Sequence, residues 1–185
     1  MLTKLLALPT LLALVSAHAI LKTPLPRTSG TAQASLCGAA FAEKLNSDPA
    51  GPIENAMAKA DASYKCNAYL CRGYQYEDNV KRVQKYSAGQ IVPFYVDLVA
   101  AHRPGWANVS VVDLKTNKAI GLPLKSWSVW PDSVSGGGDD VDFNITIPST
   151  LGSACDVGGK CALQWYWWSN SNSQTYESCV DFYVK

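Results

Sequence analysis

Residues 141–147 read VDFNITI, and their polarity alternates without a break. The apolar side chains of Val141, Phe143, Ile145 and Ile147 fall on one face, and the polar side chains between them fall on the other. Strict alternation of this kind is typical of a β-strand with one buried face and one solvated face. The stretch therefore predicts a sheet whose apolar face is covered, as in a β-sandwich.

Similar stretches extend the β pattern along the chain. Alternating or apolar segments predict further strands at 91–99, 107–114, 118–124, 126–130, 161–168 and 175–184. Glycine-rich turns at 135–138 and 158–159 punctuate them in the manner of an antiparallel sandwich. One helix is expected at 52–60, where Pro52 takes the first position, and residues 63–89 are expected to form a long, disulfide-tied loop. The predicted fold class is mostly β, with one or two short helices.

The start of the chain has the pattern of a secretion signal. A positive charge precedes an apolar run that is too short to span a bilayer, and small residues end at Ala17. Cleavage after Ala17 would make His18 the new N-terminus, and cleavage after Ala19 is the alternative. We therefore expect a signal peptide at 1–17 and a single secreted domain at 18–185.

Charge and missing motifs limit the classes of function. The chain has 16 basic and 15 acidic side chains, and one lysine lies in the expected signal, so the mature chain would carry no formal net charge. This balance argues against nucleic acid or an anionic membrane as a partner, and we expect a monomer. No HExxH motif, GxSxG motif or phosphate-binding glycine loop occurs. Paired carboxylates for glycoside hydrolysis remain an open alternative.

The cysteines and sequons fit an extracellular protein. Six cysteines in a secreted chain indicate three disulfides. Local spacing favours two pairs and leaves a third by remainder: Cys66–Cys71, Cys155–Cys161 and Cys37–Cys179. Sequons at Asn108 and Asn144 fall on strand faces expected to be exposed, so both are candidate sites of N-linked glycosylation.

The chain has two histidines, and their positions suggest a metal site. At a new N-terminus, the α-amino nitrogen and the imidazole of His18 can bind one metal together. His102 follows the predicted strand at 91–99, and its imidazole would supply a third nitrogen. Three neutral nitrogen donors in one plane favour Cu(II). Each histidine also has an ordinary interpretation, one as the residue after a cleavage site and the other as a surface loop residue.

Four segments of the sequence resemble lytic polysaccharide monooxygenases. They are HAILKTPLPR at 18–27, CNAYLCRGYQYEDN at 66–79, AAHRPGWANVSVVDL at 100–114 and LQWYWWSNSNSQTYESCVDFYV at 163–184. The chain looks most similar to the fungal group called auxiliary activity family 16, within the chitin-binding type-4 fold family. This resemblance implies an immunoglobulin- or fibronectin-like β-sandwich with one copper on a flat face.

The resemblance also implies roles for individual residues. His18 and His102 would bind the copper, and Tyr176, five residues before Asp181, would be its axial neighbour. Gln164 is the candidate polar group beside the bound oxygen species. The alternatives are a core aromatic for Tyr176 and an amide satisfied within the sheet, away from the metal, for Gln164.

The implied activity is oxidative cleavage of a polysaccharide by a secreted, copper-dependent monooxygenase. It would use an external electron donor and O2 or H2O2, with cellulose as the first expected substrate and C1 as the expected position. Trp106 and Trp168 depart from the family pattern, and each is either a platform for a sugar ring or an isolated surface residue. Two other functions stay open: a copper carrier of the same fold, and a non-catalytic protein that binds chitin or cellulose.

Overall fold

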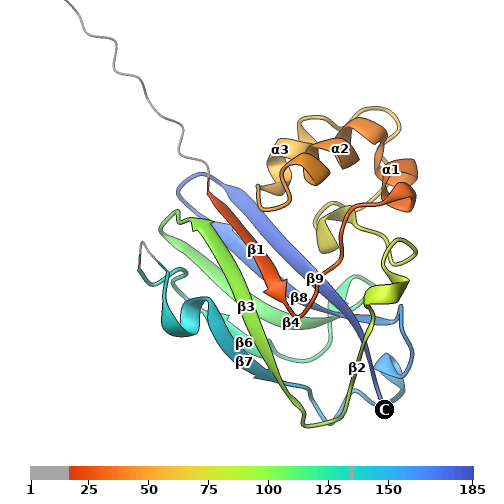
Figure 1. Ribbon diagram of the computed structural model, residues 1–185, viewed down its shortest axis with the longest axis vertical. Coiled ribbons are helices and arrows are strands. Elements are labelled where there is room, and N and C mark those ends of the chain that lie inside the picture. Colours follow the sequence, from red (N-terminus) through yellow and green to blue (C-terminus); the bar gives the residue numbers. More distant parts are fainter. Residues whose placement is uncertain (1–16, 134–135) are drawn as a thin grey trace, which may run out of the picture.

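The computed structural model describes residues 17–133 and 136–185. The rest of the expected signal peptide, and residue 135 of the expected turn, lie outside these ranges. Two β-sheets pack against each other, and three helices lie together to one side of them (Figure 1). This architecture confirms the predicted mostly β sandwich. In the described part of the chain, no helix is long and apolar enough to cross a membrane.

The two sheets differ in size. The smaller has the order β1–β3–β7, from β1 (His18–Thr23), β3 (Ile91–Ala100) and β7 (Asp142–Thr146). The larger has the order β2–β9–β8–β4–β5, from β2 (Gln84–Tyr86), β9 (Gln174–Val184), β8 (Cys161–Ser169), β4 (Gly105–Asp113) and β5 (Lys118–Ala119). β6 (Lys125–Trp127) pairs with β4. β2 and β9 are parallel, and the other described pairs are antiparallel.

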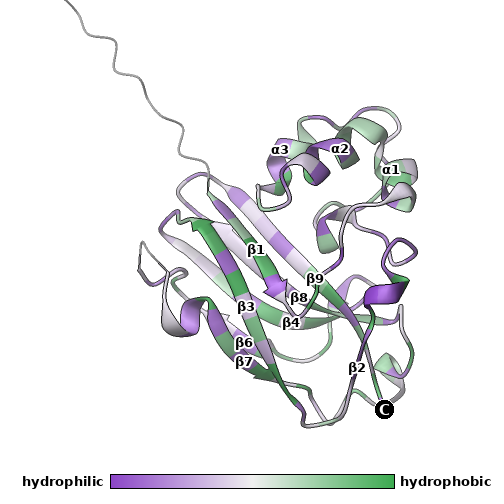
Figure 2. Ribbon diagram, viewed as in Figure 1, coloured by the Kyte–Doolittle hydropathy of each residue, from purple (hydrophilic) through white to green (hydrophobic). Residues whose placement is uncertain are grey.

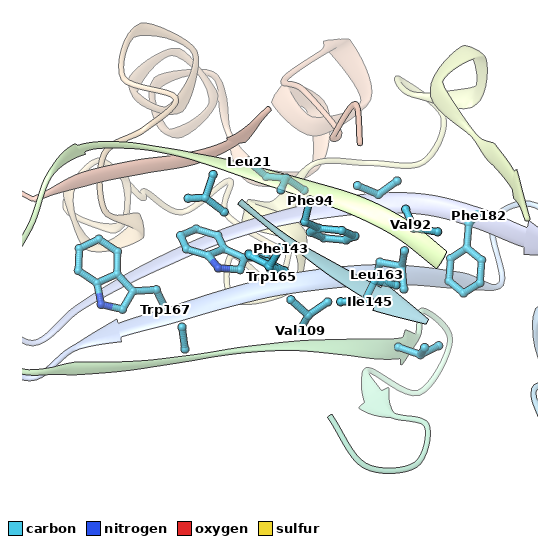
Figure 3. Packing of buried hydrophobic residues seen from close by; sticks show 14 of the residues in the cluster. Leu21, Val92, Phe94, Val109, Phe143, Ile145, Leu163, Trp165, Trp167 and Phe182 are labelled. Carbon is cyan, nitrogen blue, oxygen red and sulfur yellow. The ribbon is translucent and has the colours of Figure 1, made fainter. Parts of the chain in front are cut away.

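The core lies between the two sheets and follows the alternation in the sequence. Phe143 and Ile145 of β7 point inward, and the Phe143 ring stacks on Phe94 of β3 with a centroid distance of 5.4 Å. Trp165 and Trp167 of β8 face them from the larger sheet (Figure 3). Hydrophobic residues recur along β1 and β3 in Figure 2. The apolar face that the sequence predicts for 141–147 is therefore the face that is buried.

The helices are the part of the fold that the sequence pattern predicts least well. α3 (Ile53–Met57) lies within the helix expected at 52–60 but is shorter, and α1 (Thr31–Cys37) and α2 (Ala39–Ser47) were not expected. All three are too short for a clear 3.6-residue period. They bury a small core of their own around Phe41 and Ile53. Single turns of 3₁₀ helix occur at Cys71–Gly73, Val80–Arg82, Gly138–Asp140 and Gly152–Cys155.

Two of the three expected disulfides are wrong. Cys155–Cys161 forms as predicted. The other bonds are Cys37–Cys66 and Cys71–Cys179, instead of Cys66–Cys71 and Cys37–Cys179. The physical reason is that Cys66 packs beside the helices, whereas Cys71 packs with Cys179 and Ala162 against the larger sheet. Gly73 lets the chain pass between these two groups, because a Cβ there would lie 3.0 Å from both sulfurs of Cys37–Cys66.

A buried ion pair fastens the segment after β1 to the last strand. The Arg27 guanidinium donates two hydrogen bonds to the Asp181 carboxylate, at 2.7 and 2.6 Å, and both side chains are buried. We expect Asp181→Ala to lower the free energy of unfolding by about 3–5 kcal/mol, because it leaves the guanidinium charge buried without its partner. Urea unfolding measures this loss. Asp156→Ala, in the exposed pair Lys160–Asp156, is the control and should leave the unfolding midpoint nearly unchanged.

Candidate metal centre

The two histidines lie at the same end of the sandwich because their strands are neighbours. His18 begins β1 and pairs in register with Ala100, the last residue of β3. His102 follows Ala100 by two residues, at the start of the connection to β4. Both histidines are half-buried. The predicted pairing of His18 with His102 is therefore compatible with the strand register.

The His102 loop is held in place on both sides. The Pro104 carbonyl accepts a hydrogen bond from the Asn170 amide at 2.9 Å, and the Gly105 carbonyl accepts one from the Trp130 amide at 2.8 Å. A Cβ at Gly105 would lie 2.6 Å from the Trp167 indole nitrogen and 2.7 Å from the Trp168 carbonyl oxygen. Only glycine fits this close approach of β4 to β8, which gives a physical reason for Gly105 at the start of β4.

Tyr176 lies beside the start of β1. Its side chain is fully buried in β9 and its ring stacks on Trp167, with a centroid distance of 4.3 Å. Its hydroxyl lies 3.0 Å from the Ala17 carbonyl oxygen and 2.7 Å from Gln174 Oε1. Burial raises the pKa of the Tyr176 phenol well above its usual range, so the hydroxyl stays protonated. Cleavage after Ala17 would place this neutral hydroxyl next to the new α-amino group.

Asn172 and Gln174 link His102 to Tyr176. The Asn172 side-chain amide lies 2.5 Å from His102 Nδ1 and also contacts Gln174 Oε1. Gln174 in turn contacts the Tyr176 hydroxyl. If Nδ1 of His102 is engaged in this way, Nε2 is the ring nitrogen placed to bind a metal.

The carboxylate of Asp48 contacts the imidazole of His18. It lies 3.1 Å from His18 Nε2 and 3.2 Å from the Lys44 ammonium. Arg72 stabilises the turn that carries Asp48, because its buried guanidinium donates to the Gly51 carbonyl at 2.8 Å and to the Asp48 carbonyl at 3.4 Å. A carboxylate on one imidazole nitrogen is the usual partner of a histidine that binds metal through the other.

The structure does not bring Gln164 to this site, so that assignment is corrected. Gln164 lies in the middle of β8, on the outer face of the larger sheet, where it contacts the carboxyl of Glu177. Burial raises the pKa of the Glu177 carboxyl to about 7, and hydrogen bonds from Arg72 and Gln164 limit the rise. Gln164 therefore lies at the alternative position, within the sheet and away from the histidines. The glutamine near the histidines is Gln174.

The available donors fit a copper brace. In the described ranges, no group of three or more His, Cys, Asp or Glu side chains is placed to share a metal. The brace that the resemblance implies needs no such group, because two imidazoles and one α-amino nitrogen provide its three donors. The end of the sandwich supplies two of these directly, and the third depends on cleavage before His18.

Comparison with known families agrees with this geometry. The family model for lytic polysaccharide mono-oxygenases, described as cellulose-degrading, matches residues 18–182. The chain belongs to this family. The comparison with curated proteins found no match.

A solved lytic polysaccharide monooxygenase shares the fold, and two further solved structures are similar to this chain at lower TM-scores. The catalytic domain of one from Listeria monocytogenes is 15% identical with a TM-score of 0.50, over 91% of this chain and 99% of that chain. An AA10 enzyme from Streptomyces lividans is 14% identical with a TM-score of 0.49, over 90% and 99%. A CBM33 protein from Bacillus amyloliquefaciens, solved with Cu(I), is 15% identical with a TM-score of 0.48, over 91% and 100%. At such identities the likeness concerns the fold alone.

For this member of the family, a local signal could have identified Gln174 from the sequence. Gln174 and Tyr176 are two residues apart on one strand, so their side chains share a face. Asp48 and Asn172 had no comparable signal, because a helix end and a turn bring them to the site.

The contact of Asp48 with His18 leads to a prediction. We expect Asp48→Ala to weaken Cu(II) binding by about 10–100-fold, the usual effect of removing an outer carboxylate that orients a ligating histidine. Isothermal titration of processed protein measures the change. Asp97→Ala is the matched control, because Asp97 is also a partly exposed carboxylate in an ion pair, with Lys22 across β1 and β3. Equal affinities for wild type and Asp48→Ala would contradict the role of Asp48.

Proposed function

We propose that this chain is a secreted, copper-dependent monooxygenase that cleaves cellulose oxidatively, with C1 as the favoured position. The observation that carries the proposal is the meeting of His18, His102 and the Tyr176 hydroxyl at one end of the sandwich. The family match over residues 18–182 supports the same reaction class. We place the chain in the fungal auxiliary activity family 16 group, as part of the same proposal.

The residues around the site have separable roles. His18 provides the α-amino nitrogen and one imidazole, and Asp48 holds its ring through Nε2. His102 provides the second imidazole, and Asn172 fixes the orientation of that ring through Nδ1. The Tyr176 hydroxyl, kept neutral by burial, would lie next to the bound metal without adding a charge. Copper, when bound, supplies one-electron redox chemistry toward O2 or H2O2 after an external donor has reduced it.

A copper carrier of the same fold is the second candidate, and Asp48 is the observation that favours it. A carboxylate near the metal is expected in a carrier, and Asp48 lies 3.1 Å from His18. Its contact is to Nε2, however, whereas a chelate with the α-amino nitrogen uses Nδ1. Asp48 is therefore placed to orient the ring, and the monooxygenase is the better-supported function.

Product analysis separates the candidates. Copper-loaded, correctly processed protein is incubated with ascorbate and H2O2 on cellulose, chitin and xylan separately. The soluble products are then identified by mass spectrometry. The proposal predicts aldonic oligosaccharides from cellulose. Tight copper binding without any oxidised sugar would indicate the carrier. Retention on an insoluble polysaccharide that is independent of copper, again without oxidised products, would indicate the non-catalytic binder.

A further inference from the structure

A shallow groove crosses the outer face of the larger sheet, away from the core. It is lined by residues of β4, β5 and β8, among them Trp106, Asn108, Ser110, Gln164 and Tyr166. The ring of Trp106 stacks on that of Tyr166 with a centroid distance of 5.1 Å and an interplanar angle of 28°. α3 packs against β9, which β8 separates from β4 in the larger sheet. Trp106 of β4 is 38% exposed.

The sequon residue Asn108 lies within this groove. It pairs in register with Tyr166 of β8 and with Ser126 of β6. Trp106 precedes it by two residues on β4, so the side chains of Trp106 and Asn108 point to the same face. Asn108 is half-buried, not exposed as the alternation predicts, because these rings and strands surround it. Its Oδ1 accepts a hydrogen bond from the Ser110 hydroxyl at 3.4 Å.

The occupant of the groove is suggested by the chemistry of its rings and by what the sequon carries. One side of a pyranose ring presents C–H groups, which pack well on the flat apolar face of an indole or phenol. Side chains two apart on a strand are separated by about 7 Å, and cross-strand neighbours by about 5 Å. A sugar bonded to the Asn108 amide nitrogen is therefore within reach of both rings.

We propose that this groove binds the protein's own N-linked glycan, with the first N-acetylglucosamine on Asn108 packed against the Trp106–Tyr166 pair. This inference rests on the proposed secretion but not on the copper chemistry. It assigns Trp106 to the protein's own glycan instead of to the polysaccharide substrate. The second sequon differs, because Asn144 is exposed on β7 and its register partner is Pro93, which has no aromatic ring.

Glycopeptide mass spectrometry and thermal unfolding test the proposal on protein secreted from a eukaryotic host. We expect occupancy at Asn108. Trimming the glycans to a single N-acetylglucosamine should leave Tm unchanged, whereas Asn108→Gln should lower Tm by roughly 2–4 °C, a shift typical of losing one modest contact in a chain of this size. In a Trp106→Ala background, Asn108→Gln should change Tm by less than about 1 °C. In a Trp106→Phe background, Asn108→Gln should again lower Tm by most of the amount seen with Trp106 present. Asn144→Gln is the matched control and should leave Tm unchanged.

Two results would overturn the proposal. One is an Asn108 that carries no glycan. Glycan at Asn144 in the same sample is the control, because it shows that the chain passed through the secretory pathway. The other is the same loss of Tm from Asn108→Gln with and without Trp106. If Asn108 is bare and Trp106→Ala weakens retention on insoluble polysaccharide, the groove binds external saccharide instead. None of these measurements depends on copper, so they are distinct from failure of the proposed enzyme function.

Discussion

Retaining one residue in front of His18 is expected to abolish tight copper binding. In protein that keeps Ala17, the nitrogen of His18 is a peptide amide and not an amine, so one of the three proposed donors is lost. The loss should exceed the roughly 10–100-fold that removal of an outer partner costs. Because Tyr176 already contacts the Ala17 carbonyl at 3.0 Å, the extended protein should keep its fold.

Cu(II) titration of two preparations measures this effect. One starts at His18 and the other at Ala17, with N-terminal sequencing of both. A third preparation that carries an extra alanine after Lys185, an exposed C-terminal residue, is the matched control and should bind copper normally. Equal affinity in the preparations starting at His18 and Ala17 would show that the α-amino group is not a ligand.

Replacing His102 is the second change with a large expected effect. We expect His102→Ala to weaken Cu(II) binding by more than about 100-fold, because loss of a donor costs more than loss of its outer partner. The electron paramagnetic resonance spectrum of bound Cu(II), expected to be nitrogen-rich and tetragonal in the wild type, should change as well. Arg103→Ala is the control, because Arg103 is exposed and next to His102 in the chain. If His102→Ala binds copper as wild type does, His102 is an ordinary loop residue.

Most of the strands could be predicted from the sequence because polarity alone sets which face of a strand is buried, but β1 (His18–Thr23) and β2 (Gln84–Tyr86) were not expected. VDFNITI is the clearest case, since Phe143 and Ile145 lie in the core as the alternation requires. The segments at 118–124 and 126–130 gave much shorter strands, β5 and β6. Gly121, with φ +74°, and Pro123 interrupt the first of them. Local pattern therefore determined most of the sandwich.

The pairing of side chains that are distant in sequence could not be predicted in the same way. Cys66 and Cys71 are close in sequence, but they face different apolar clusters, so short spacing gave the wrong disulfides. Gln164 and Gln174 are the same residue type on neighbouring strands. The spacing of Gln174 from Tyr176 was the available signal, and the strand register shows that Gln164 lies away from the site. Asp48 reaches His18 through a turn that Arg72 holds. His18 and His102, by contrast, could be named as candidate metal ligands from the sequence because the chain has only two histidines.

We propose that His18, freed by cleavage, makes this sandwich a polysaccharide-oxidising enzyme. The most direct measurement is the mass spectrum of soluble products from cellulose treated with equal amounts of the His18-started and Ala17-started proteins, each with copper, ascorbate and H2O2. We expect aldonic oligosaccharides from the His18-started protein and none above background from the Ala17-started protein. Equal yields of oxidised sugar from both, or none from the copper-saturated His18-started protein, would contradict it.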